Sequence, residues 1–254
     1  MDSQTHSTFS ADGSIRYDEY KKLDRPITIT DHLDYEYCGK EEFVFNIEAF
    51  FEEYTPRRSR KLFLGAELNL RDVSKACFKA WENIYPLDFL LGSTHNPYAA
   101  KDNLGFYAPV HFVGMKPLEA QRYYLEEVEK CLEAFPEANS FAHIDYIFRY
   151  HKWLGSFYDI ESLNDDLSRV FKLLREHDTA LEINTYLFKD PLVRQGWLKL
   201  LKLYRDRGGE MVTIGSDAHV GQHLYRYYDE AVELVNEVGL KHVYFERRKP
   251  ELVV

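Results

Sequence analysis

Short apolar segments alternate with segments of helical periodicity along this chain. Six segments rich in apolar and β-forming residues lie at 27–30, 61–70, 87–93, 140–145, 180–184 and 211–216, and residues 3–7 form a weaker seventh. The clearest helical spacing lies at 117–135, 161–177, 191–207 and 223–238. A strand–helix alternation of this kind predicts right-handed βαβ units with parallel strands.

Seven such units suit an α/β barrel that is one unit short of the usual eight, although an open, doubly wound sheet has the same local pattern. The chain has 254 residues, of which 45% are hydrophobic. That size and composition suit one globular domain, so we expect a single domain over residues 1–254. The positions of the polar residues favour the barrel over the open sheet.

Composition excludes several classes of protein. The formal net charge of −10 argues against binding to long nucleic acid, which relies on Lys and Arg, but permits a small phosphorylated substrate. No segment is apolar over the roughly 20 residues that span a bilayer, and the N-terminus lacks a signal-peptide core. Cys38, Cys77 and Cys131 suggest neither a disulfide framework nor a zinc ribbon. We therefore expect a cytoplasmic protein without membrane contact.

Polar side chains of metal-ligand type follow each of the apolar segments. In chain order these are Gln4 and His6, His32, Glu67, His95, His143 and Asp145, Glu182 and Asn184, and Asp217 and His219. In a parallel barrel the carboxyl ends of all strands open onto one face, so these residues should converge on one pocket. The remaining histidines are better explained as surface residues: His111, His151, His177, His223 and His242.

Imidazole and carboxylate groups without thiolate suit Zn²⁺, Mn²⁺ or Fe²⁺, and this set exceeds the needs of one ion. The sequence therefore predicts two or three divalent ions. Ions roughly 3.5–4 Å apart can share a hydroxide, lower its pKa and clamp a phosphoryl group during attack. This chemistry favours hydrolysis of a phosphate ester. Residues 96–116 and 150–160 interrupt the strand–helix pattern, and we expect them to wall or cover the site.

The motifs "THSTFSADG", "TITDHLDY", "GAELN", "GSTHN", "HIDYIFRY", "LEINT" and "GSDAH" resemble the PHP (polymerase and histidinol phosphatase) superfamily, and within it the stand-alone histidinol-phosphatase branch. The resemblance runs from residue 2 to about residue 222. It implies a distorted (β/α)7, TIM-like barrel with a trinuclear metal centre. By motif, His6, Glu67, Asp217 and the residue at position 4 would bind a first metal. Glu67 would bridge to a second metal on His95 and His143, and a third would take Asp12, His32 and His219.

The resemblance also implies functional roles. Arg149 and Lys189 would bind the phosphate, with Arg194 as a substitute for Lys189, and Glu67, Asp217 and His219 would act directly in the reaction. One position departs from the family's His-x-His motif, because Gln4 stands where the first histidine is expected. A neutral amide oxygen is a poorer ligand for these metals than imidazole. The first metal site is therefore the one expected to be weak or altered.

The leading hypothesis is a metal-dependent phosphatase that hydrolyses a small phosphate ester, with L-histidinol phosphate as the expected substrate. A second hypothesis keeps the same site but directs it at nucleotides or short oligonucleotides. A third is a catalytically impaired metal-binding relative, for which Gln4 is the direct support. The sequence leaves the oligomeric state open.

Overall fold

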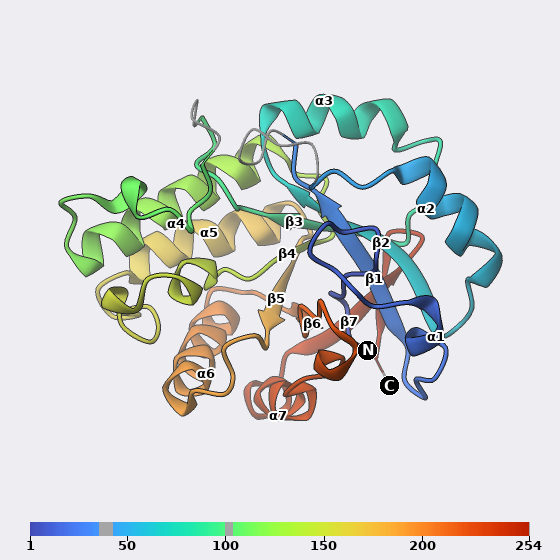
Figure 1. Cartoon of the computed structure of the whole chain (residues 1–254). Coiled ribbons are helices and arrows are strands. Elements are labelled where there is room, and N and C mark those ends of the chain that lie inside the picture. Colours follow the sequence, from blue (N-terminus) through green and yellow to red (C-terminus); the bar gives the residue numbers. More distant parts are fainter. Residues whose placement is uncertain (36–42, 100–103, 254) are drawn as a thin grey trace.

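A computed structural model describes residues 1–35, 43–99 and 104–253 of the chain. Its strands form one sheet in the order β1 to β8. The sheet curves around the centre of the molecule with the helices packed outside it (Figure 1). The strands are β1 Ile27–Leu33, β2 Leu62–Asn69, β3 Phe89–Ser93, β4 Ser140–Phe141, β5 Ala180–Asn184, β6 Met211–Gly215, β7 Lys241–Glu246 and β8 Lys249–Leu252.

Strands β1 to β7 pair in parallel, as the sequence predicts. The whole of β1, β2, β3 and β5 and the last four residues of β6 are buried. Strands buried on both faces read as continuous apolar runs rather than alternating ones, which explains why these segments are visible in the sequence. The predicted strand over 140–145 is shorter in the structure, because only Ser140–Phe141 pair as strand.

Residues 2–6 close the ring between β1 and β6. They form isolated bridges rather than the weak seventh strand that the sequence suggests, with Asp2 opposite Ile27 and Thr5 opposite Ala218. Their backbone still bonds on both sides: Thr30 N donates to Thr5 O at 2.8 Å, and Ser3 N donates to Ile214 O at 2.8 Å. This segment thus carries Gln4 and His6 into the interior of the barrel.

The chain ends in a hairpin that the sequence analysis did not anticipate. Strand β7 pairs in parallel with the start of β6, and β8 pairs antiparallel with β7. Only Val243 and Phe245 of β7 are buried, where they pack with Phe89 and Leu91 of β3. A strand with two buried positions in alternation gives a weak signal compared with the continuous runs of the other strands.

The main helices are α1 Tyr17–Tyr20, α2 Ile47–Tyr54, α3 Asp72–Trp81, α4 Pro117–Ala134, α5 Asn164–Glu176, α6 Pro191–Asp206 and α7 Tyr228–Val238. Pro117 and Pro191 occupy the first turns of their helices, as expected. Asp190 caps α6 by accepting a bond from Leu192 N at 2.9 Å. Helix α7 begins later than predicted, because Gly221–His223 form a separate 3-10 turn and Tyr225 and Tyr227 have positive φ.

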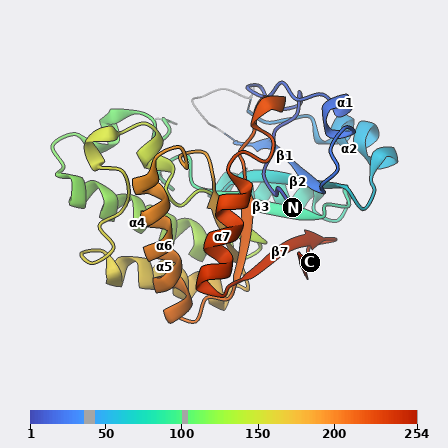
Figure 2. The same cartoon turned by 90° about the horizontal axis from the view of Figure 1, so that it is seen from below.

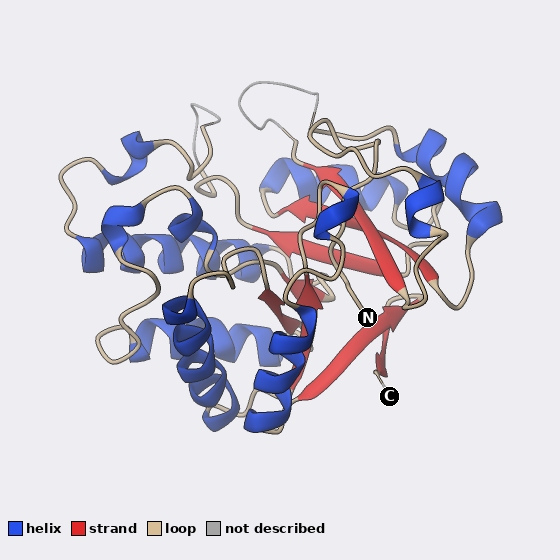
Figure 3. Cartoon of the chain, turned by 60° about the horizontal axis from the view of Figure 1, so that its bottom comes forward, coloured by secondary structure: helices blue, strands red, loops and turns tan. Residues whose placement is uncertain are grey.

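Helices pack on the outer face of the sheet, as the view from below makes clear (Figures 2 and 3). Within the described ranges, no helix is both long and apolar enough to cross a bilayer. Cys77 and Cys131 are free thiols, whereas Cys38 lies outside the described residues. The buried apolar side chains form one large cluster and a smaller second one, which joins β3 to β7.

Candidate metal centre

The predicted ligand-type residues meet at the carboxyl ends of the strands. His32 lies in β1 and Glu67 in β2, whereas His95, His143 and Asp217 each follow a strand by two residues. They line a pocket of about 400 Å³, whose wall consists of Asp12, His32, Asp34, Phe43, Glu67, His95, His143, Tyr146, Arg149, Tyr150, Tyr186, Asp217, His219, Val220 and His223. The convergence expected from a parallel barrel is present.

Glu67 lies at the centre of this group and is fully buried. Its Oε1 atom is 2.9 Å from His143 Nε2 and 3.1 Å from His95 Nε2. Its Oε2 atom is 3.4 Å from His6 Nε2 and 3.6 Å from His32 Nδ1. Each carboxylate oxygen therefore faces a different pair of imidazoles, which is the arrangement that the predicted bridging role requires.

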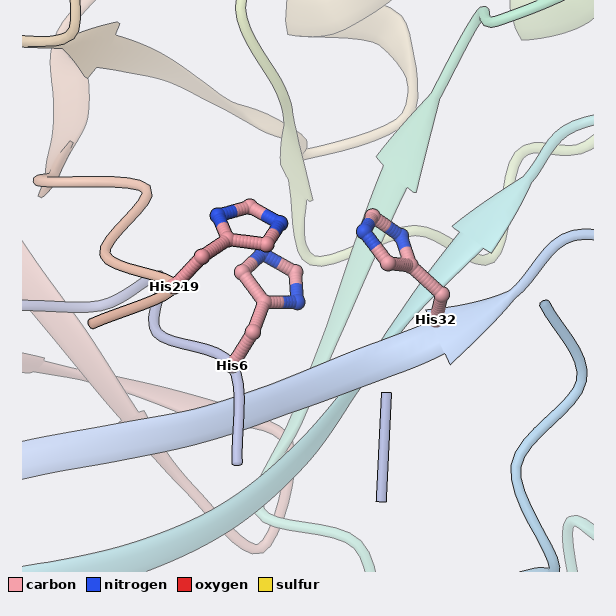
Figure 4. A group of neighbouring side chains, drawn as sticks. All are labelled: His6, His32 and His219. Carbon is pink, nitrogen blue, oxygen red and sulfur yellow. The ribbon is translucent and has the colours of Figure 1, made fainter. Parts of the chain in front are cut away.

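The rings of His6, His32 and His219 form a second group (Figure 4). The His6 ring stacks on His32 and on His219, with centroid distances of 4.3 and 4.1 Å. Asp12 extends from the turn after residues 2–6, and its carboxylate oxygens lie 3.7 Å from His32 Nε2 and 3.4 Å from His219 Nε2. The structure thus brings Asp12 to the two histidines with which the resemblance grouped it.

Two of the ligand-type residues have backbone angles that L-residues rarely adopt. His143 has φ 25° and Asp217 has φ 52°. Such conformations cost roughly 1–3 kcal/mol each and occur mainly where the surrounding structure imposes them. The backbone N–H of His143 donates to Glu182 Oε2 at 2.9 Å, which helps to hold the strained residue.

The charges at the site follow from burial and proximity. Burial opposes ionisation of Glu67, but the surrounding imidazoles outweigh it and hold its pKa well below the usual range. Burial opposes the charge of Asp217 as well, yet Arg149 and neighbouring histidines also keep its pKa well below the usual range. Burial lowers the pKa of His143 to about 4. Ionised carboxylates and neutral imidazoles are the forms that bind a metal ion. Glu67, Asp217 and His143 are therefore in the binding form, whereas His95 and His219, whose pKa values are raised by neighbouring carboxylates despite burial, would release a proton on binding.

The donor atoms fit divalent metal ions. Among the described residues, three groups have ligand atoms within 4.8 Å of one another: His6, His32 and His219; His32, Asp34 and His95; and Glu67, His95 and His143. His6 Nε2, His32 Nδ1 and Asp34 Oδ1 are among the buried atoms that have no hydrogen-bond partner within the described part of the chain. Buried polar atoms are normally satisfied, so these point to a missing partner. The pocket is a metal-binding site built from several residues.

Asp34 was not among the predicted site residues, although it lies in the "TITDHLDY" motif. Its Oδ2 atom is 2.7 Å from His95 Nδ1. A carboxylate on one ring nitrogen of a histidine commonly orients the other nitrogen toward a metal. The signal available in the sequence was the spacing of two from His32, which places both side chains on the same face of an extended segment.

Gln4 is buried at the position predicted for a metal ligand. Its Nε2 atom donates to Glu67 Oε2 at 2.8 Å, and its Oε1 atom accepts from Asn184 Nδ2 at 2.7 Å. Both ends of the amide are thus engaged by protein groups. Glu182, another residue at a predicted strand end, lies next to them, and burial raises its pKa well above the usual range.

The two predicted phosphate-binding residues have different locations. Arg149 is buried in the pocket wall, with NH1 2.6 Å from Asp217 Oδ2. Its Nε and NH2 atoms make no hydrogen bond within the described residues. Lys189 is exposed and does not line the pocket, and Arg194 donates to Phe188 O at 3.0 Å. A second arginine, Arg226, lies near the site instead, with its guanidinium 4.7 Å from the Tyr186 ring centre.

The outer wall of the pocket is aromatic. Tyr150 belongs to the predicted wall segment 150–160, but no described residue of 96–116 lines the pocket, and residues 100–103 lie outside the described ranges.

The prediction of surface positions fails for two histidines. His151 is buried and its Nε2 bonds to Phe106 O at 2.7 Å, and His223, in the turn after β6, lines the pocket.

Comparison with known proteins places this arrangement in context. The PHP domain model matches residues 2–186. A probable histidinol-phosphatase of Clostridium acetobutylicum is 31% identical over 98% of this chain and 97% of its own length. One of Thermotoga maritima is 30% identical over the same shares. A crystal structure of histidinol phosphate phosphatase from Lactococcus lactis, complexed with zinc, L-histidinol and phosphate, matches with a TM-score of 0.87 and 26% identity over 98% of both chains.

Proposed function

The chain belongs to the PHP family, and from that premise we propose that it is a metal-dependent phosphatase that hydrolyses L-histidinol phosphate to L-histidinol and phosphate. The predicted family, its histidinol-phosphatase branch and the distorted barrel are confirmed by the relatives and by the similar crystal structure. The observation that carries the proposal is the convergence of the His, Asp and Glu side chains around Glu67 in one pocket.

The pocket has donors for two or three divalent ions, and zinc is the metal in the similar crystal structure. Glu67, His95 and His143 would hold one ion, and His32, His219 and Asp12 another. His6 and Asp217 would complete the centre, with His6 Nε2 3.2 Å from Asp217 Oδ1. Bound divalent ions supply Lewis acidity, which lowers the pKa of a water molecule and neutralises charge on phosphoryl oxygens.

Arg149 is the phosphate-binding residue that the geometry supports best. Burial opposes its charge, but Asp217 and Asp145 outweigh that effect and raise its pKa further above the usual range. The guanidinium lies 4.5 Å from the Tyr186 ring centre and 5.4 Å from that of Tyr146, so it contacts two aromatic side chains. A planar guanidinium whose Nε and NH2 groups make no hydrogen bond within the described residues can donate to two oxygens of a phosphate.

The organic part of the substrate would lie against the aromatic wall. Phe43, Tyr150 and Tyr186 line the pocket, and Tyr186 is 43% exposed. A flat imidazole ring packs well against such side chains.

The direct test measures phosphate release from L-histidinol phosphate, from nucleoside monophosphates and from a dinucleotide, using zinc- or manganese-loaded protein. We expect kcat/KM for L-histidinol phosphate to exceed the others by at least about 100-fold, because each unpaired polar group in a mismatched pocket costs more than 1 kcal/mol. Equal or greater activity on nucleotides would favour the second hypothesis, and no activity on any of them would favour the impaired relative.

A pair of variants tests the phosphate-binding assignment. Arg149→Lys keeps the charge but loses the planar fork, so we expect kcat/KM to fall by about 100-fold. Lys189→Ala removes an exposed charge outside the pocket, so we expect a change of less than about twofold. Equal losses in the two variants would contradict the assignment to Arg149.

A further inference from the structure

Gln4 stands at a ligand position yet points an N–H group at the metal centre. It is fully buried, and its amide nitrogen donates to Glu67 Oε2 at 2.8 Å. Its amide oxygen, the only atom of the side chain that can bind a metal, faces Asn184 on the side away from Glu67.

The orientation of this amide follows from its neighbours at both ends. The backbone N–H of Tyr186 donates to Asn184 Oδ1 at 3.0 Å, so the Asn184 Nδ2 group faces the other way. That Nδ2 group donates to Gln4 Oε1 and, at 3.2 Å, to Glu182 Oε2. At the far end, an ionised Glu67 can only accept a hydrogen bond. Reversing the Gln4 amide would place two donors against each other and two acceptors against each other.

The amide also engages one particular oxygen of Glu67. Oε2 is the oxygen that faces His6, at 3.4 Å, and it receives the Gln4 N–H. Oε1 faces His95 and His143 and takes no bond from Gln4. The Glu67 oxygen that would bind the first metal, Oε2, therefore already accepts a hydrogen bond from Gln4.

We propose that Gln4 is a positioning residue for Glu67 rather than a metal ligand, and that the centre holds two divalent ions tightly instead of three. The deficient site is the one formed by His6, Glu67 and Asp217. It lacks a fourth donor, and a metal ion there would compete with the Gln4 N–H group for Glu67 Oε2. The inference rests on the metal centre of the proposed function and is independent of its substrate.

The test is the metal content of wild-type protein and of Gln4→His, each loaded with excess zinc and desalted at neutral pH. Elemental analysis should give about two zinc ions per wild-type chain and about three per chain in the variant, because the imidazole supplies the missing donor. Three ions in the wild type, or the same count in both proteins, would overturn the proposal.

Gln4→Leu is the matched control, because it removes both hydrogen bonds of the amide without adding a ligand. We expect it to retain about two ions, and three would show that position 4 need not supply a donor. A crystal structure of the zinc-loaded wild type tests the proposal even if the variants fail to fold. A hydrogen bond from Gln4 Nε2 to Glu67 in that structure would support the proposal. Gln4 Oε1 bonded to zinc would overturn it. Because no substrate is present, inactivity on L-histidinol phosphate would leave these results standing.

Discussion

At the scale of single residues, hydrogen bonds behind the histidines decide which ring nitrogen faces the pocket. Asp34 engages His95 Nδ1, which leaves His95 Nε2 directed at Glu67 Oε1. Glu182 acts on the backbone instead, because its Oε2 accepts a hydrogen bond from the N–H of His143. These carboxylates fix the ligand geometry without necessarily touching an ion, so their removal should change metal affinity more than fold stability.

Asp34→Asn should weaken zinc binding by about 10- to 100-fold, because it removes the charged acceptor for His95 Nδ1. The measurement is a competition titration against a chromophoric chelator. Asp206→Asn, which changes an exposed acid paired with Arg205, serves as the control and should leave the affinity unchanged. Equal affinity in wild type and Asp34→Asn would contradict the orienting role.

Asp145 should make stability fall as pH rises. Burial raises its pKa to about 6, whereas the pKa in an unfolded chain is about 4. An acid whose pKa is raised by folding favours the folded state below the unfolded pKa, and this contribution is lost as the pH rises through the folded pKa.

Asp145→Asn removes this titration and keeps an acceptor for Trp197 Nε1, which donates to Asp145 Oδ2 at 3.2 Å. Relative to wild type, we expect the variant to gain about 2 kcal/mol in free energy of unfolding between pH 4 and pH 7. Urea unfolding of metal-free protein at both pH values measures the difference. A difference that stays constant with pH would rule out the raised pKa.

At the scale of elements, the two ends of the strands have separate tasks. The carboxyl ends and the turns after them carry the ligands, while the opposite end is packed by the β7–β8 hairpin. Phe245 of β7 is buried and stacks on Phe89 at the start of β3, with ring centroids 5.4 Å apart. This contact should therefore contribute to stability and not to the chemistry of the site.

Phe245→Ala should lower the free energy of unfolding by about 3–5 kcal/mol, because it leaves a cavity where an aromatic ring was buried. Denaturant unfolding measures this loss, and kcat/KM of the folded variant should stay within about twofold of wild type. Leu252→Ala in β8 is the control, since Leu252 is 59% exposed and should change stability by less than about 0.5 kcal/mol. A large loss of kcat/KM in folded Phe245→Ala would refute the division of tasks.

At the scale of the whole molecule, the metal centre joins segments from both ends of the chain. His6 and His219 stack although more than 200 residues separate them, and residues 2–6 reach this position by bonding to both β1 and β6. Ions bound at this junction would connect the first strand to the last turns of the barrel. Metal binding should therefore be coupled to global stability.

Removal of metal with a chelator should lower the thermal midpoint by roughly 5–10 °C relative to protein with zinc at 100 times its Kd, since such binding contributes about 2.7 kcal/mol. Differential scanning calorimetry measures the shift, and Glu67→Gln should lose most of it. An unchanged midpoint after verified metal removal would mean that the ions do not link the two ends of the barrel.

The sequence alone was enough to predict the parallel strands and the convergence of ligand-type residues at their ends. Strands buried on both faces must be continuously apolar, and parallel strands must present their carboxyl ends together, so both features leave a local signal. The segments around β2, β3 and β5 and the residues Glu67, His95 and His143 were recognisable for this reason. The hairpin β7–β8 was missed because only two of its positions are buried.

Only the tertiary structure decided how those residues are oriented and which others join them. Asp34 belongs to the site because of a contact across 61 residues to His95, and Lys189 is separated from it because its loop points to solvent. The direction of the Gln4 amide is set by Asn184 and Tyr186, which are about 180 residues away along the chain. A sequence specifies the residue at each position, but a hydrogen-bond direction depends on partners that only the folded chain brings together.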